Sequence, residues 1–279
     1  MSRFVALLSC LAALAPASAA GQVLRYGGDP GTARAYVREQ HDRVIQTVNG
    51  RQLGTEIESF WRLKATVTAT SPEAVTLAIE HDSLAISGAP GASEPDLAEL
   101  YGIPIEIVMS RRGEVREVTA PDSLPAVAIR LDLATAYRSF FPRLPDGEAG
   151  EGTAWSDTTT VTAHQNGLDL TVLRVNRYAS KGWATHGTRR VVRVDYEGIL
   201  TIEGSGEQQE AGIVLTGSGR AAGGFSFDPE AGAFVAGGET TEMRMVALIT
   251  AQGQNLLIPI VQNRAETIEL VEPEAPPGR

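Results

Sequence analysis

The chain has 279 residues, a net charge of −10 at neutral pH and one cysteine, and 43% of its residues are hydrophobic. An acidic balance of this size disfavours nucleic acids and anionic lipid surfaces as partners, because both are recognised by basic patches. Beyond the N-terminal segment, no run reaches the roughly 18 apolar residues that a membrane-spanning helix requires. The composition therefore predicts a protein that is not an integral membrane protein of the helical kind, with a core large enough to stabilise it without disulfides.

The first 20 residues are typical of a secretory signal peptide. A short basic start precedes the apolar run 4–15, and small residues follow it. This order predicts export to the periplasm or the extracellular space, with cleavage after Ala19 or Ala20. A lipoprotein signal ending at Cys10 is the less favoured alternative, because cleavage there would leave an apolar segment on the mature protein. The lack of a cysteine framework and of glycosylation sequons favours a bacterial cell envelope.

The first half of the chain, residues 21–139, is predicted to form a β lobe. Apolar and polar residues alternate along 63–69, 75–79 and 103–109. A period of two indicates strands with one buried face. The dipeptide Asn49-Gly50 between two such runs is a strong signal for a hairpin. Together these signals predict a meander of about five strands.

Helix is expected at two places in this half. A short helix is predicted from Glu94 to Tyr101, with Ser93 as its N-cap. A longer one is predicted within residues 121–141, where Asp122 or Ser123 can cap the N-terminus and apolar residues follow a helical stripe. This second helix is expected to cover the sheet of the first lobe.

Residues 140–154 are predicted to link two halves of the molecule. Two prolines end the helix and three glycines free the backbone. Three apolar residues are expected to fold back onto the core: Phe140, Phe141 and Leu144. Trp155 would then begin a new sheet. The alternative, in which Trp155 and Asp157 belong to a functional site, is less favoured.

Residues 155–272 are predicted to form a second β lobe. Turns or breaks are expected at residues 166–167, 204–206, 228–232 and 251–255. After the last turn, the sequences LLIPIVQ and ETIELVE are expected as separate strands. Residues 273–279 are typical of a disordered tail.

The predicted fold class is mainly β with few helices (α+β). We expect two tandem curved antiparallel β-sheet lobes, each shaped like a half-barrel, with one helix covering the first. The two halves share an order of strand, polar turn and strand, which supports the tandem arrangement.

No catalytic motif stands out. The serines of the two G-S-G sequences lack the nucleophile-elbow pattern and a following helix, and phosphate-binding and dinucleotide-binding fingerprints are absent, so no cofactor is expected. The pairs His41-Asp42 and His81-Asp82 recur forty residues apart and could form a metal or acid–base site if they met in space. Solvated strand positions are the favoured interpretation of all four residues.

Several short motifs resemble a family of uncharacterised secreted or lipid-anchored bacterial β-rich proteins. They are the central segment Phe141-Pro142-Arg143-Leu144-Pro145, then Gly152 and Trp155, and the later turn with Phe227-Asp228 and Gly232. The chain departs from lipid-anchored members because its lipobox is poor. The family has no established activity, so the resemblance implies architecture and location only.

The favoured function is a binding protein without catalytic activity that holds an apolar small molecule or lipid. Curved sheets with a covering helix enclose apolar cavities well. Candidate lining residues are Met109, Phe140, Phe141, Phe225, Phe227, Met243 and Met245. The same residues fit an ordinary core, which is the favoured interpretation of the individual side chains. The alternatives are a structural or protein-interaction module and, less favoured, a hydrolase at the His-Asp pairs. The oligomeric state is left open.

Overall fold

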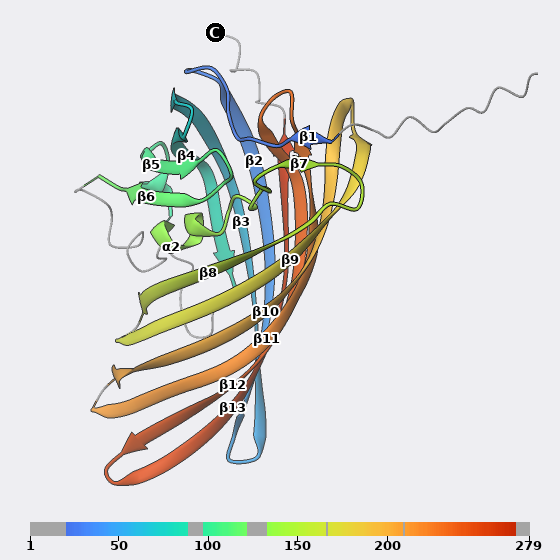
Figure 1. Cartoon of the computed structure of the whole chain (residues 1–279). Helices are drawn as coiled ribbons and strands as arrows, with labels where there is room; N and C mark the ends of the chain where they lie inside the picture. Colours follow the sequence, from blue (N-terminus) through green and yellow to red (C-terminus); the bar gives the residue numbers. More distant parts are fainter. Residues whose placement is uncertain (1–20, 89–96, 122–132, 166, 209, 272–279) are drawn as a thin grey trace, which may run out of the picture.

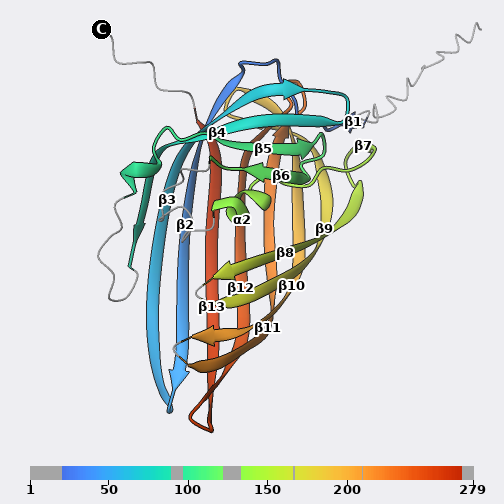
Figure 2. The same ribbon diagram turned by 90° about the vertical axis from the view of Figure 1, so that its left-hand side faces the viewer.

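A computed structural model describes residues 21–88, 97–121, 133–165, 167–208 and 210–271. Eleven antiparallel strands form one strongly curved sheet, in the order β6-β5-β4-β3-β2-β13-β12-β11-β10-β9-β8, and a short helix lies inside the curve (Figures 1 and 2). The two edge strands do not pair with each other, so the sheet stays open. The predicted signal peptide and the C-terminal tail lie outside the described residues.

The elements are long compared with ordinary strands. In the large sheet they are β2 (Ala33–Val48), β3 (Arg51–Thr70), β4 (Ala74–Ser87), β5 (Ile105–Ser110), β6 (Val115–Thr119), β8 (Ala154–Gln165), β9 (Leu168–His186), β10 (Arg189–Gln208), β11 (Ala211–Asp228), β12 (Ala233–Ala251) and β13 (Gln254–Val271). A separate two-stranded sheet pairs β1 (Gln22–Val23) with β7 (Glu148–Ala149).

The predicted meander of the first half is confirmed. Strands β2 to β6 are consecutive neighbours in the sheet. Asn49 and Gly50 form the turn between β2 and β3 with φ angles of 49° and 77°, as a two-residue hairpin of the primed type requires. Turns also occur where they were expected at 228–232 and at 252–253.

The two halves do not form separate lobes. Strand β13 pairs with β2, from Leu270 opposite Tyr36 to Ile260 opposite Gln46, so the last strand of the second half continues the sheet of the first. This pairing satisfies the backbone groups of an otherwise open edge of β2. The expectation of two tandem lobes is therefore replaced by a single sheet.

The glycines at 204 and 206 do not break a strand. Strand β10 runs through them without interruption, and a Cβ atom at Gly206 would overlap the carbonyl oxygen of Gly167. The glycine thus allows a close approach of the β8–β9 hairpin rather than a turn. Likewise, LLIPIVQ and ETIELVE belong to one strand, β13.

Helical structure is limited in the described residues. Helix α2 (Leu133–Arg138) matches the end of the longer predicted helix, and residues 122–132 of that prediction lie outside the described residues. Residues 93–96 of the short predicted helix, with its N-cap, lie outside the described residues, and its last part contains a 3-10 turn, η1 (Ala98–Leu100). No helix in the described part of the chain is long and apolar enough to cross a membrane.

The main core lies between the upper part of the concave face and the segment from α2 to Leu144. Tyr137 and Leu144 are fully buried there, and Phe140 and Phe141 are 3% and 5% exposed, as the sequence predicted for the phenylalanines and the leucine. Trp155 stacks on Tyr178 at the start of β8. This packing holds α2 over the concave face and so creates the roof of the cavity described next.

Candidate functional site

A cavity of about 460 Å³ lies between the concave face of the sheet and the segment that contains α2. Its roof includes Phe140, Phe141 and Arg143, and its walls come from β2, β3 and strands β8 to β13. Because the strands are antiparallel and in register, concave side chains form rows that cross the sheet. Polar rows lie next to the roof, and an apolar row lies beyond them.

On β2 and β13 the polar residues of the concave face alternate along each strand. They are Arg38, Gln40 and Asp42 on β2, and Gln262, Arg264 and Glu266 on β13. Asp42 accepts hydrogen bonds from Nε of Arg264 at 2.8 Å, from Nε2 of Gln262 at 2.9 Å and from the amide of Gln40. Burial raises the pKa of the Asp42 carboxyl, but the charge of Arg264 and these hydrogen bonds outweigh it, so this pKa lies below its usual range. Asp42 is therefore a buried, fully paired carboxylate.

A second network on β9, β10 and β12 closes around Glu239. Both terminal nitrogens of Arg174 donate to its carboxylate, Tyr196 donates at 2.7 Å and Thr241 at 2.9 Å. Burial raises the pKa of Glu239, but the hydrogen bonds and the charge of Arg174 outweigh this effect. The pKa therefore lies below its usual range, and the carboxyl stays ionised at neutral pH. Such bidentate pairs fix side-chain orientation as well as charge.

Two buried donors in this cavity have no hydrogen-bond partner among the described residues: Nε of Arg38 and Nε1 of Trp61. Arg38 and Trp61 lie opposite each other on β2 and β3, with the guanidinium 4.4 Å from the ring centre, and both line the cavity. Arg38 also donates to Glu266 at 2.6 Å. An unpaired buried donor is costly, so these two N–H groups mark a place where an acceptor would be stabilised.

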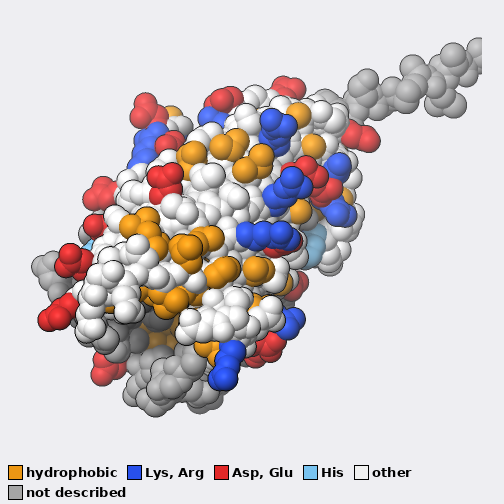
Figure 3. All heavy atoms as spheres, turned by 90° about the horizontal axis from the view of Figure 1, so that it is seen from below, with side chains coloured by type: hydrophobic (Ala, Val, Ile, Leu, Met, Phe, Trp, Pro, Cys, Tyr) orange, Lys and Arg blue, Asp and Glu red, His pale blue; other side chains and the backbone are white. Residues whose placement is uncertain are grey.

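The apolar row crosses six neighbouring strands at directly opposed positions. We define it as Val161, Val172, Ile202, Gly217, Met245 and Ile260. Val161 and Val172 also line the cavity, so the row continues from it. The side chain of Met245 covers Gly217, where a Cβ atom would lie 2.5 Å from its Cγ. Seen from below, the molecule shows several patches of hydrophobic side chains between its polar residues (Figure 3).

The predicted ligand-binding residues fall into two groups. Five of them belong to the main core: Met109, Phe140, Phe141, Phe225 and Phe227. Of these, Phe140, Phe141 and Phe225 line the cavity. Met243 and Met245 belong instead to a small second cluster with Ile202.

The two His-Asp pairs do not meet. His81 is buried on β4, where its ring contacts the hydroxyl of Tyr137 at 2.9 Å, and burial lowers its pKa. His41 is half exposed on β2 and lies 3.6 Å from Glu58. Asp42 points to the concave face, and Asp82 is exposed at a bulge of β4. His81 and Asp42 thus differ from the expectation of solvated strand positions, and no cluster of three metal-ligating side chains occurs among the described residues.

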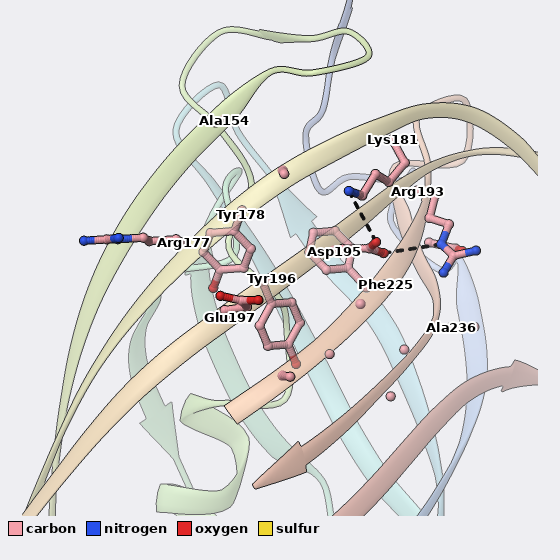
Figure 4. A pocket seen from close by; sticks show the side chains of 17 residues that line it. Ala154, Arg177, Tyr178, Lys181, Arg193, Asp195, Tyr196, Glu197, Phe225 and Ala236 are labelled. Carbon is pink, nitrogen blue, oxygen red and sulfur yellow. Dashed lines mark ion pairs between the residues drawn. The ribbon is translucent and has the colours of Figure 1, made fainter. Parts of the chain in front are cut away.

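A larger groove, of about 890 Å³, lies on the opposite face of the sheet (Figure 4). Lys181 and Arg193 flank Asp195 there, at 3.6 and 3.4 Å. All three side chains are 41–63% exposed, so the charges are solvated and paired with one another. The concave cavity is the stronger candidate, because its polar groups are buried and two of them lack a partner.

Sequence analysis missed the polar rows. Their signal is present as alternating polar residues: Arg38, Gln40 and Asp42 on β2, and Gln262, Arg264 and Glu266 on β13. A period of two is usually read with the polar residues facing solvent. Here they face the covered side, while Ile199 and Leu257 on the outer face are 61% and 62% exposed.

Comparisons with known proteins leave the family open. No family model and no curated protein matches the chain. Among solved structures, lipovitellin aligns at 12% identity and a TM-score of 0.43 over 90% of this chain, which spans about a quarter (26%) of the lipovitellin chain. A mutant of the porin of Rh. blastica aligns at 13% identity, TM-score 0.24, over 84% of this chain and 99% of the porin. Pseudomonas aeruginosa OccK11 (OpdR) aligns at 7% identity, TM-score 0.25, over 89% and 100% of the two chains. The resemblance to a family of secreted proteins stays a prediction.

Proposed function

We propose that this protein is a non-enzymatic binding protein of the bacterial cell envelope, and that it holds an apolar or amphipathic small molecule against the concave face of its sheet. The observation that carries the proposal is the cavity beneath α2, which continues into the apolar row. A volume of about 460 Å³ lies within the range of about 300–1,000 Å³ typical of small-molecule sites.

The shape of the site favours a long ligand. Six strands spaced about 4.8 Å apart place the ends of the apolar row roughly 24 Å from each other. One leaflet of a bilayer has about half of a 30 Å hydrocarbon thickness, so the row is long enough for a single acyl chain. Met245 and the neighbouring Met243 have flexible side chains that can move aside to admit a ligand.

A substitution within the row tests the proposal. Replacing Val172 with tryptophan places a bulky ring where the cavity joins the row, and we expect at least a tenfold loss of affinity for a fluorescent fatty-acid analogue. Replacing the next residue, Leu173, with tryptophan is the matched control, because Leu173 faces the other side of the sheet and is 39% exposed. Circular dichroism verifies that both variants fold. Equal binding by the two variants would contradict the proposed site.

Export to the envelope is part of the proposal and rests on the N-terminal sequence. The mature protein isolated from its native cells should begin at Ala20 or Gly21, which intact-mass measurement reads directly. A mass with a diacylated Cys10 would instead indicate a membrane-anchored form of the same binding protein.

The second candidate is an interaction module, and one observation favours it. Strand β8 pairs only with β9, so the outer edge of its 12 residues has no strand partner among the described residues. An open edge of this length can accept a strand from another protein. This alternative would be favoured if a Val172→Trp variant complemented a deletion strain as well as the wild-type protein does, while a variant with strand-breaking substitutions in β8 failed to complement it.

A further inference from the structure

Arg38 and Trp61 together point to the chemistry of the ligand's polar end. The side chain of Arg38 is 10% exposed and Trp61 is 6% exposed, so neither unpaired N–H group reaches bulk water. The pairing of β2 with β3 places the two residues directly opposite each other. Each of these two donors lacks an acceptor, and a ligand group that carries two acceptor atoms would satisfy both once the side chains move to admit it.

The charge around these donors favours an anion. Five arginines line the cavity, in a chain whose net charge is −10. Four of the five are paired with carboxylates, and Arg138 at the end of α2 forms no ion pair with a described residue. A neutral carbonyl could accept the same hydrogen bonds, but it would gain nothing from the charge of Arg138, with which no described carboxylate pairs.

We propose that the ligand is an anionic amphiphile whose carboxylate or phosphate accepts hydrogen bonds from Nε of Arg38 and Nε1 of Trp61, while its chain lies along the apolar row. This inference rests on the proposed function and adds the class of head group to it. Trp61 and Arg38 select the anion, and Val161 and Val172 begin the path that the chain follows away from it.

Equilibrium dialysis against palmitate and hexadecanol tests the head group, because the two probes share a chain and differ at its end. We expect palmitate to bind the full-length mature protein about tenfold more tightly than hexadecanol. Lysophosphatidic acid serves as a third probe, and its affinity relative to palmitate distinguishes a phosphate from a carboxylate head group. A preference for either acid over the alcohol supports the proposal.

Two variants assign the preference to the named atoms. Trp61→Phe keeps an aromatic ring but removes the N–H, and Arg38→Lys keeps a positive charge for Glu266 but removes Nε–H. Each should lower the affinity for palmitate about tenfold and that for hexadecanol by much less, because a hydrogen bond to a carboxylate is stronger than one to a hydroxyl oxygen. Arg43→Gln is the control, because Arg43 lies on the same strand but on the outer face and is 59% exposed.

The outcomes separate the two levels of the proposal. Equal binding of palmitate and hexadecanol, or a preference that both variants retain, would overturn the anionic head group while leaving a binding protein for apolar ligands. If the wild-type protein bound none of the three probes, both the head group and the proposed function would be wrong.

Discussion

At the scale of single residues, the concave face combines buried charges that are paired with buried donors that are not. Asp42 and Glu239 each accept several hydrogen bonds, and their neighbours hold them ionised. Arg38 and Trp61 keep one free donor each. Since native proteins leave few buried polar groups unpaired, such exceptions indicate function more strongly than the paired groups around them do.

At this scale, the burial of His81 predicts how the stability of the protein depends on pH. Its pKa is lowered by burial, so the folded protein holds the neutral ring while the unfolded chain protonates near pH 6.5. The stability that the neutral ring contributes is present above that pH and is lost as the pH falls toward the lower folded-state pKa, by at most about 1.4 kcal/mol per pH unit. Urea unfolding between pH 7 and pH 5 should show a smaller decline for His81→Phe than for wild type.

The control for this measurement is His41→Gln at the other histidine of the predicted pairs, which is 48% exposed, and it tests whether the loss of any histidine gives the same result. If His81→Phe and wild type lost stability in parallel, His81 would not be the buried neutral group that the structure contains.

At the scale of elements, the hairpins could be predicted from the sequence and the faces of the strands could not. The turn at Asn49-Gly50 has a local cause, because both residues adopt positive φ, so this turn can be predicted from the dipeptide alone. The glycine at position 206 is required by a long-range contact, the close approach of the β8–β9 hairpin, and no local sequence pattern reveals such a contact. The polar rows were missed for the same reason, because alternation does not say which side of a sheet becomes covered.

Gly206 carries a prediction for strand β10. Gly206→Ala should destabilise the protein by about 1–3 kcal/mol, because the added methyl group would overlap the carbonyl oxygen of Gly167. Gly212→Ala on β11 is the matched control, since its nearest atom, the Thr250 carbonyl oxygen, would be 3.9 Å away. Thermal unfolding compares the two, and equal midpoints would argue against the close approach of the hairpin.

At the scale of the whole molecule, the curved sheet is one unit because β2 and β13 join the two ends of the chain. The main core also combines both halves: Tyr26 and Tyr36 from the first part contact Phe227 and Phe234 from the second. The tandem-lobe prediction failed because hairpin signals describe neighbours in sequence, whereas this closing pair is the most distant in sequence within the sheet.

A fragment tests this unity. Residues 21–139 alone would expose the edge of β2 and lose half of the core, so we expect no dispersed NMR spectrum for the isolated fragment. The full chain should unfold in a single transition. A well-folded fragment would restore the two-lobe description.

Native mass spectrometry of the mature protein, purified gently from its own cell envelope together with lipid extraction of the same sample, tests the central claim most directly. The account predicts a stoichiometric co-purifying molecule with an acyl chain and an anionic end. A clean ligand-free mass, unchanged after incubation with palmitate or lysophosphatidic acid, would contradict it and favour the interaction module with its open β8 edge.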